Sequence, residues 1–166
     1  DTVTYAASAA GVVASLTSGL AGVVQTNDAE GDSYINIENL TGTMYADTLI
    51  GNSAANTLNG GNGDDLLEGL GGGDAFIGDL GNDTVSYAHS SASVVASLTT
   101  SFGSGPAVVQ TNDAYGDTFS GIENLQGSAY GDTLIGDGGS NRIAGGTGDD
   151  VLEGMGGADV LEGGFG

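Results

Sequence analysis

Apolar and acidic side chains recur in this 166-residue chain with a spacing of nine residues, in two blocks separated by a stretch of different pattern. Within each block a glycine opens every nonapeptide, an Asp or Asn stands at its sixth position and an apolar residue at its eighth. Three registers held together over nine segments indicate a repeat architecture. The apolar positions are Leu49, Leu58, Leu67, Phe76 and Val85 in the first block and Leu134, Ile143, Leu152 and Leu161 in the second.

Residues 1–18 and 83–100, which connect the nonapeptide blocks, alternate in part between apolar and polar side chains. An alternation of period two predicts β-strands. We therefore expect these segments to continue the structure that the nonapeptides build.

A longer period divides the chain into two copies of one unit, residues 1–82 with a nonapeptide block at 42–86 and residues 83–166 with a block at 127–166. The sequence VVASLT of residues 12–17 returns at 94–99, and IENL of residues 37–40 returns at 122–125. We expect one continuous solenoid. The second copy is longer near Gly103, Gly105 and Pro106, which predicts an exposed loop there.

The best-formed segments, GGNGDDLLE at 60–68 and GGTGDDVLE at 145–153, resemble the pattern GGxGxDxLx of RTX (repeats-in-toxin) calcium-binding domains in type I-secreted bacterial proteins. The resemblance implies an all-β fold, a right-handed parallel β-roll with calcium ions between stacked glycine-rich turns. Two nonapeptides then form one coil. Asp47, Asp65 and Asp83 would share one stack of turns and Asn56 and Asp74 the other.

The residue types suit calcium on chemical grounds as well. Ca²⁺ takes about six to eight oxygen ligands, so backbone carbonyls must add to the carboxylates, and glycines let a turn aim them. We expect several ions, about three in the first block and two or three in the second. The candidate metal residues are Asp47, Asn56, Gly60, Gly61, Asn62, Gly63, Asp65, Asp74, Asp83, Asp132, Asn141, Gly145, Gly146, Thr147, Gly148, Asp150 and Asp159.

These turns differ in how closely they match the pattern GGxGxDxLx. Tyr45 and Tyr130 replace a glycine in two turns, and two others end in the neutral amides of Asn56 and Asn141. We expect those turns to bind more weakly or only to complete a neighbouring site. Glu38 and Glu123 could complete a calcium shell, although a solvated strand position is the favoured interpretation for both.

Composition narrows the function further. The chain has 22 acidic residues, one Arg, no Lys and a net charge of −21, so it should repel itself without bound cations, and folding should be linked to metal binding. Acidic, glycine-rich chains are also often disordered, which we expect only without calcium. Phosphate backbones are bound by Lys and Arg, which disfavours nucleic acid as a partner. No apolar run of about 18 residues is present, so no membrane insertion is expected.

Catalytic machinery is not evident. His89 is the only histidine, Ala7 takes its place in the first copy, and Cys is absent, so a surface histidine is expected. Acidic pairs such as Asp64 with Asp65 are explained by the metal turns. We therefore predict that the chain is not an enzyme.

Three functions stay open. The first is a structural RTX module that folds on meeting extracellular calcium and supports the secretion and stability of a larger exported protein, through type I secretion machinery. The second is an adhesin-type or carbohydrate-binding module on a bacterial surface. Tyr5, Tyr87, Tyr115 and Tyr130 would be its platforms for a polysaccharide or cell-surface glycan where they are exposed, although aromatic residues in such a roll as often pack inward. The third is the non-catalytic C-terminal part of a secreted hydrolase or epimerase.

Ice binding is disfavoured because the seventh position of the repeat varies from turn to turn. Both ends of the sequence resemble cuts in a longer protein. We expect the last coil to fray or to pair with another chain through its open edge.

Overall fold

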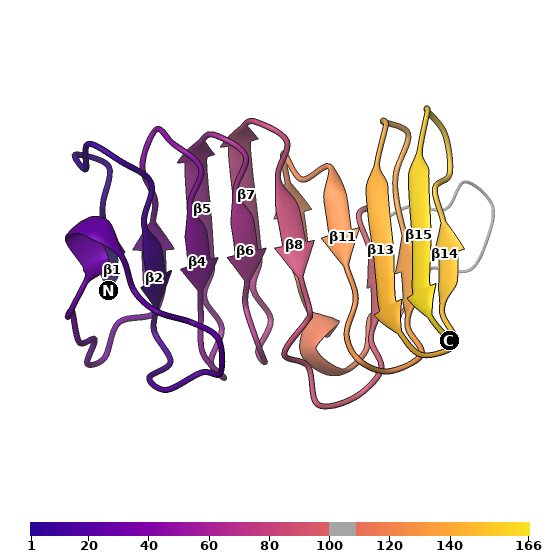
Figure 1. Ribbon diagram of the computed structural model, residues 1–166, viewed down its shortest axis with the longest axis horizontal. Coiled ribbons are helices and arrows are strands. Elements are labelled where there is room, and N and C mark those ends of the chain that lie inside the picture. The colour runs from indigo at the N-terminus through magenta and orange to yellow at the C-terminus, as the bar shows by residue number, and fades with distance from the viewer. Residues whose placement is uncertain (100–108) are drawn as a thin grey trace.

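The computed structural model describes residues 1–99 and 109–166, which wind into a parallel β-roll with its coils stacked along one long axis (Figure 1). The predicted all-β class and roll are confirmed. The loop expected around Gly103, Gly105 and Pro106 lies outside the described residues.

Most of the strands are three residues long, because each nonapeptide has only a short apolar segment after its turn. Two 3-10 turns, η1 (Asn27–Ala29) and η2 (Asn112–Ala114), are the helical elements of the described residues. The strands are β1 (Thr2–Thr4), β2 (Val13–Ser15), β3 (Asn39–Thr41), β4 (Thr48–Ile50), β5 (Thr57–Asn62), β6 (Leu66–Glu68), β7 (Ala75–Leu80), β8 (Thr84–Ser86), β9 (Val95–Ser97), β10 (Thr118–Ser120), β11 (Asn124–Gln126), β12 (Thr133–Ile135), β13 (Arg142–Thr147), β14 (Val151–Glu153) and β15 (Val160–Phe165).

Successive strands alternate between sheets, so each strand pairs in parallel with the strand one coil away. One sheet has the order β1-β3-β5-β7-β10, a second β2-β4-β6-β8-β11-β13-β15, and a third β9-β12-β14. The segments 1–18 and 83–100 supply β1, β2, β8 and β9, as their alternation predicts.

The core is a thin double column of side chains between the sheets. Position eight points inward in seven of the nine nonapeptides, as where Leu49 pairs in register with Leu67 and Leu58 pairs with Phe76, whereas Leu152 is partly buried and Leu161 is exposed. The inward side chains are almost fully buried. Burying one such side chain contributes roughly 1.5–3 kcal/mol. Because each coil adds only a few apolar side chains, the roll has little hydrophobic stability to offset its chain entropy.

The strands of the second copy continue the sheets of the first. β8 and β11 extend the sheet of β2, β4 and β6, and β10 pairs with β7. β10 lies in the longer connection between β9 and β11. The corresponding residues of the first copy, 33–35, form no strand.

Some turns carry a residue other than glycine in the left-handed region of backbone space. Gly61 and Gly146 occupy the second turn position with φ of +102° and +105°. The equivalent positions of other turns are Leu70 (φ +69°), Asp79 (φ +65°) and Met155 (φ +66°). This conformation brings Cβ close to a carbonyl oxygen and costs about 1–2 kcal/mol for a residue with a side chain.

The strain at Leu70 predicts that glycine fits better there. Leu70→Gly should raise the free energy of unfolding of the calcium-loaded chain by about 0.5–1 kcal/mol, because relief of the left-handed strain exceeds the extra entropy of an unfolded glycine. Denaturant unfolding of Leu70→Gly beside Leu70→Ala checks this, since alanine removes the same side chain but keeps Cβ. Equal stability of the two variants would contradict the prediction.

Candidate metal site

The turns of successive coils are joined by a column of carboxylates. The backbone N–H of Asp47 donates to Oδ1 of Asp65 at 2.8 Å, and that of Asp65 donates to Oδ1 of Asp83 at 2.8 Å. On the opposite side of the roll the N–H of Asn56 donates to Oδ1 of Asp74 at 2.8 Å. Each bond spans one coil. The structure thus places Asp47, Asp65 and Asp83 in one column and Asn56 with Asp74 in the other.

The second block repeats the arrangement. The N–H of Asp132 donates to Oδ1 of Asp150 at 2.8 Å, and the N–H of Asn141 donates to Oδ1 of Asp159 at 3.0 Å. The columns therefore follow from the nonapeptide register, which sets an Asp or Asn at the sixth position of every segment.

Two further acids extend the first-block columns beyond the nonapeptides. The N–H of Asp74 donates to Oδ1 of Asp117, and the N–H of Asp83 donates to Oε2 of Glu123, both at 2.8 Å. Asp117 stands in the nonapeptide register with Phe119 but lacks the opening glycine, a signal too weak to place it among the candidate residues. The solvated interpretation of Glu123 is wrong, because its carboxylate continues the column.

One oxygen of each well-matched carboxylate is buried without a partner. Among the described residues, Oδ2 of Asp65, Asp74, Asp83 and Asp150 accepts no hydrogen bond and is shielded from solvent. An unpaired buried charge is costly, so a carboxylate in this position needs either a proton or a cation.

The glycine that opens each nonapeptide makes room beside that oxygen. A Cβ built on Gly60, Gly69, Gly78 or Gly145 would overlap Oδ2 of the Asp five residues on. At Gly145 the carbonyl oxygen of Gly163, one coil further, borders the same space at 2.8 Å from the Cβ position. Carboxylate and carbonyl oxygens around a small gap are the donor set that a hard cation such as Ca²⁺ takes. The residues present fit that ion.

In the turns that we expect to bind calcium weakly, backbone N–H groups of the protein donate hydrogen bonds to the side-chain oxygens of the sixth position. Oδ2 of Asp47 accepts the N–H of Thr43 at 2.6 Å, and Oδ2 of Asp132 accepts the N–H of Ser128 at 2.6 Å. Asn56 and Asn141 accept a backbone N–H through Oδ1 and donate through Nδ2 to the carbonyl oxygens of Glu38 and Glu123. None of these four side chains has a buried oxygen without a hydrogen-bond partner.

The candidate glycines in the best-matched turns determine how closely the coils stack. Gly61 and Gly63 have φ of +102° and +115°, and Gly146 and Gly148 have φ of +105° and +112°. A Cβ at Gly61 would overlap the carbonyl oxygen of Thr43 in the preceding coil. Between these glycines lie Asn62 and Thr147, the last residues of β5 and β13, so the strand continues into the turn.

Burial and mutual repulsion keep the column carboxyls from ionising easily. Burial first, and then the charges of Asp47 and Asp83, raise the pKa of Asp65 to about 7, although the hydrogen bond from the backbone N–H of Asp47 lowers it. Burial likewise raises the pKa of Asp74 to about 7 and of Asp117 to about 6. A bound cation would lower these pKa values, because a positive charge beside a carboxyl favours its ionised form.

The acids form columns rather than compact clusters. Within residues 1–99 and 109–166 no three His, Cys, Asp or Glu side chains converge as a metal-binding group. A metal in the turns would therefore depend on backbone carbonyls for the rest of its ligands. The same residues contain no helix long and apolar enough to cross a membrane.

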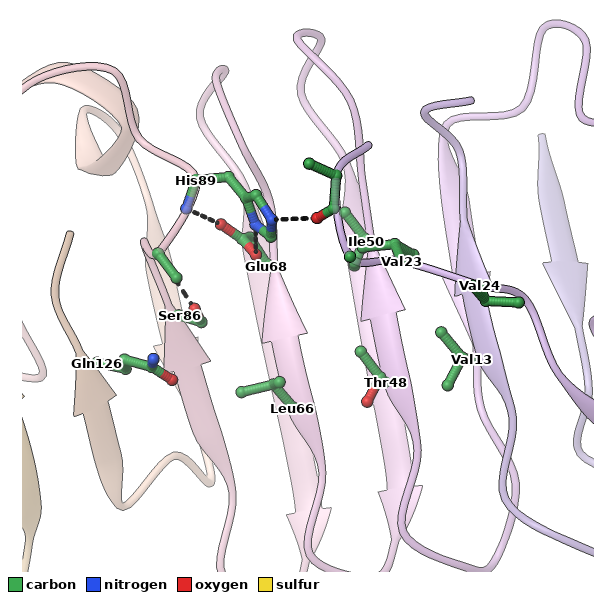
Figure 2. Close-up of a pocket in the computed structure, with 13 residues that line it drawn as sticks. Val13, Val23, Val24, Thr48, Ile50, Leu66, Glu68, Ser86, His89 and Gln126 are labelled. Atoms are coloured by element: carbon green, nitrogen blue, oxygen red, sulfur yellow. Dashed lines mark hydrogen bonds and ion pairs between the residues drawn. The ribbon is translucent and has the colours of Figure 1, made fainter. Parts of the chain in front are cut away.

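His89 lies at the surface, as expected, but it is held in place. Figure 2 shows its ring against Glu68, with Nδ1 at 2.8 Å from Oε2 of Glu68 and Nε2 at 3.2 Å from the carbonyl oxygen of Ala21. The hydrogen bond to Glu68 raises the pKa of His89. The pair borders a cavity of about 470 Å³ over the outer face of the β2-β4-β6-β8 sheet, beside Val23 and Val24. Among the described residues, no group of three or more His, Cys, Asp or Glu side chains converges there to hold a metal ion.

Two of the four tyrosines considered as platforms for a glycan, Tyr5 and Tyr87, are not exposed. Tyr5 and Tyr87 are buried and hydrogen-bond to Asp32 and Asp117, so they offer no exposed ring. They occupy equivalent positions in the two copies and pack inward because their hydroxyls find a carboxylate partner. Tyr115 and Tyr130 are exposed.

The sequence pattern of one protein family, the RTX calcium-binding nonapeptide repeat, matches the chain in four copies, at residues 41–76, 50–85, 117–152 and 135–166. These matches cover more than half of the chain and contain Asp65, Asp74, Asp83 and Asp150, the four carboxylates of the described residues that have a buried oxygen without a partner. No match to a curated protein was found.

The raised pKa values predict a pH dependence of the calcium-free chain. A carboxyl with a pKa of about 7 in the folded chain, against about 3.9 unfolded, stabilises the fold at low pH, and this contribution is lost as pH rises through about 7. Far-UV circular dichroism in EDTA should therefore show more β-structure at pH 5.5 than at pH 8. Equal or greater β-structure at pH 8 would contradict this.

The buried oxygen of Asp65 that has no hydrogen-bond partner predicts that this residue contributes to calcium binding. Asp65→Asn keeps an acceptor for the Asp47 N–H but removes the buried charge, and should raise the calcium midpoint of folding by about fivefold, or about 1 kcal/mol. Asp64→Asn is the matched control, because Asp64 is exposed and its Oδ1 accepts the Asn82 N–H. We expect that variant to shift the midpoint by less than about twofold. Calcium titrations of both variants measure the difference, and equal shifts would overturn the assignment.

Proposed function

We propose, from the premise that this chain belongs to the RTX calcium-binding nonapeptide repeat family, that it is a structural module which folds on meeting extracellular calcium. In this role it supports the secretion and stability of a larger exported bacterial protein. The observation that carries the proposal is the set of buried carboxylate oxygens without a partner, at Asp65, Asp74, Asp83 and Asp150.

Calcium binding and folding are linked through these oxygens. Without a cation, folding must bury unpaired negative charge in a chain whose net charge is already −21, and the thin core offers little to offset this cost. In the unfolded chain the carboxylates are separate and hydrated. Ca²⁺ binds the stacked turns and not the separated residues, so its binding free energy becomes folding free energy.

The number of strong sites follows from the same oxygens. Three of them, at Asp65, Asp74 and Asp83, belong to the first block, and Asp150 belongs to the second. Asp159 stands in the last coil, where it is partly exposed. We infer about three strong sites in the first block and fewer in the second, with Asp47, Asn56, Asp132 and Asn141 in a supporting role.

The calcium difference across a cell envelope would supply the switch. Extracellular calcium modules bind at roughly 10⁻⁴–10⁻³ M, far above the free calcium inside cells. A chain of this kind stays unfolded before export, as passage through type I secretion machinery requires, and folds outside. Its place is then the extracellular space or the cell surface of a bacterium.

A surface module that binds a glycan is a second candidate, favoured by the exposed rings of Tyr115 and Tyr130. Exposed aromatic rings stack on the apolar faces of sugars. The proposed calcium switch is common to this role and to a non-catalytic part of a secreted hydrolase or epimerase.

A calcium titration followed by far-UV circular dichroism at pH 7.5 tests the proposed function. We expect a cooperative gain of β-structure between about 0.1 and 1 mM Ca²⁺, reversed by EDTA. Magnesium is the control and should not induce it, because Mg²⁺ demands a smaller octahedral site and keeps its waters. A chain fully folded in EDTA at this pH would overturn the switch.

A further inference from the structure

Residues 18–24, which we call the strap, pass over the outer face of the β2-β4-β6-β8 sheet. The N–H of Leu16, before the strap, donates to the carbonyl oxygen of Ile50 at 2.8 Å, and the N–H of Thr26, after it, donates to that of Val13 at 3.2 Å. Between these two anchors the cavity of about 470 Å³ separates the strap from the sheet. The strap therefore forms one wall of this cavity and the sheet forms the other.

His89, a residue of the second copy, holds the middle of the strap (Figure 2). Its Nδ1 lies 2.8 Å from Oε2 of Glu68 on β6, and its Nε2 lies 3.2 Å from the carbonyl oxygen of Ala21 in the strap. An ionised carboxylate and a backbone carbonyl are both acceptors only. The ring can donate to both of them only as the imidazolium ion, in which each nitrogen carries a proton.

Glu68 determines which nitrogen keeps its proton when the ring becomes neutral. The residue is 4% exposed, and its Oε1 accepts the backbone N–H of His89 at 2.9 Å. A buried carboxylate oxygen without a donor is costly, so Nδ1 keeps its proton while Glu68 is ionised. The proton that leaves is therefore the one on Nε2, and a lone pair then faces the carbonyl oxygen of Ala21.

We propose that His89 fastens the strap in a proton-dependent way: the imidazolium ion holds the strap closed over the cavity, and loss of the Nε2 proton releases it. Release opens the cavity to solvent and uncovers the apolar side chains of Val13, Ile50 and Leu66 on its sheet wall. Access to this face of the roll is thus set by pH.

Glu68 is the charged group that faces His89 across the cavity. The strap contains no Asp, Glu, Lys or Arg. The other side chains that line the cavity from the sheet are uncharged: Val13, Thr48, Ile50, Leu66, Ser86 and Gln126. The hydrogen bond to Glu68 raises the pKa of His89 above its ordinary value of 6.5, against the effect of burial. Because the pKa is raised, the closed strap is fully stabilised below about pH 6.5 and this contribution is lost as pH rises through the raised value.

Nuclear magnetic resonance of the ¹⁵N-labelled chain in about 5 mM Ca²⁺ tests the proposal, with circular dichroism of the same samples. His89 is the only histidine, so its ring signals are unambiguous. Between pH 6 and pH 9 the amide order parameters of Ala21 and Gly22 should fall from about 0.85 to below about 0.6, with the midpoint of the ring titration. The ring ¹⁵N shifts should show that the remaining proton is on Nδ1.

His89→Ala removes the donor to the strap. Ala7 takes the place of His89 in the first copy, so the backbone of this turn accepts alanine. The strap of this variant should have low order parameters at every pH.

Glu68→Gln separates the proton from the packing of the ring. The amide of Gln can donate to Nδ1 and still accept the backbone N–H of His89, so the neutral ring carries its proton on Nε2 and continues to donate to Ala21. We expect His89 to titrate with a lower midpoint while the strap stays ordered to pH 9. Glu153→Gln is the matched control, because Glu153 has the same position in the second block and is exposed, and it should behave as the unmodified chain.

Three results would overturn the proposal. They are a strap that keeps its order in the unmodified chain while His89 loses its proton, a strap that stays ordered in His89→Ala, and a strap that is released in Glu68→Gln as in the unmodified chain. Loss of β-structure at the same midpoint would also overturn it, because the whole roll would then respond rather than the strap. The test requires only a folded chain, so its result is independent of whether folding itself needs calcium.

Discussion

The hydrogen bond from the backbone of one turn to the carboxylate of the next coil is the interaction on which the roll depends. It fixes the height of each coil, because Oδ1 of Asp65 must reach the N–H of Asp47 in the coil before it. It also directs the second oxygen into the turn, where the missing Cβ of the opening glycine leaves space for it. Stacking and cation binding are therefore properties of the same side chain.

The turns fall into two kinds according to where their second oxygen goes. In the first kind, represented by Asp65 and Asp150, it has no protein partner and requires a cation or a proton. In the second kind, represented by Asp47 and Asp132, a nearby Thr or Ser turns its backbone N–H and hydroxyl toward the carboxylate. The second kind begins each block and can stack without metal. The first kind stores a charge that makes stability depend on calcium and pH.

The junction between the copies shows how irregular sequence can take part in a regular roll. β10 pairs with β7, and Asp117, which directly precedes β10, occupies the next position of the column. The column is thereby completed from a residue 43 positions away rather than 18.

The sequence by itself determined the nonapeptide repeat with its acidic or amide sixth position and apolar eighth position, because a constant spacing is visible in the residues themselves. The resemblance to RTX repeats added the parallel roll and the two columns of Asp and Asn. Only the tertiary structure decided that Asp117 and Glu123 join the columns, since they arrive there through pairings between segments far apart in the chain. It also decided that Tyr5 and Tyr87 turn inward, because their carboxylate partners come from a different part of the unit. The tertiary structure also decided which carboxylates have hydrogen-bond partners for both oxygens. Asp47 and Asp65 occupy the same position of the repeat, but Oδ2 of Asp47 accepts a backbone N–H and Oδ2 of Asp65 has no hydrogen-bond partner.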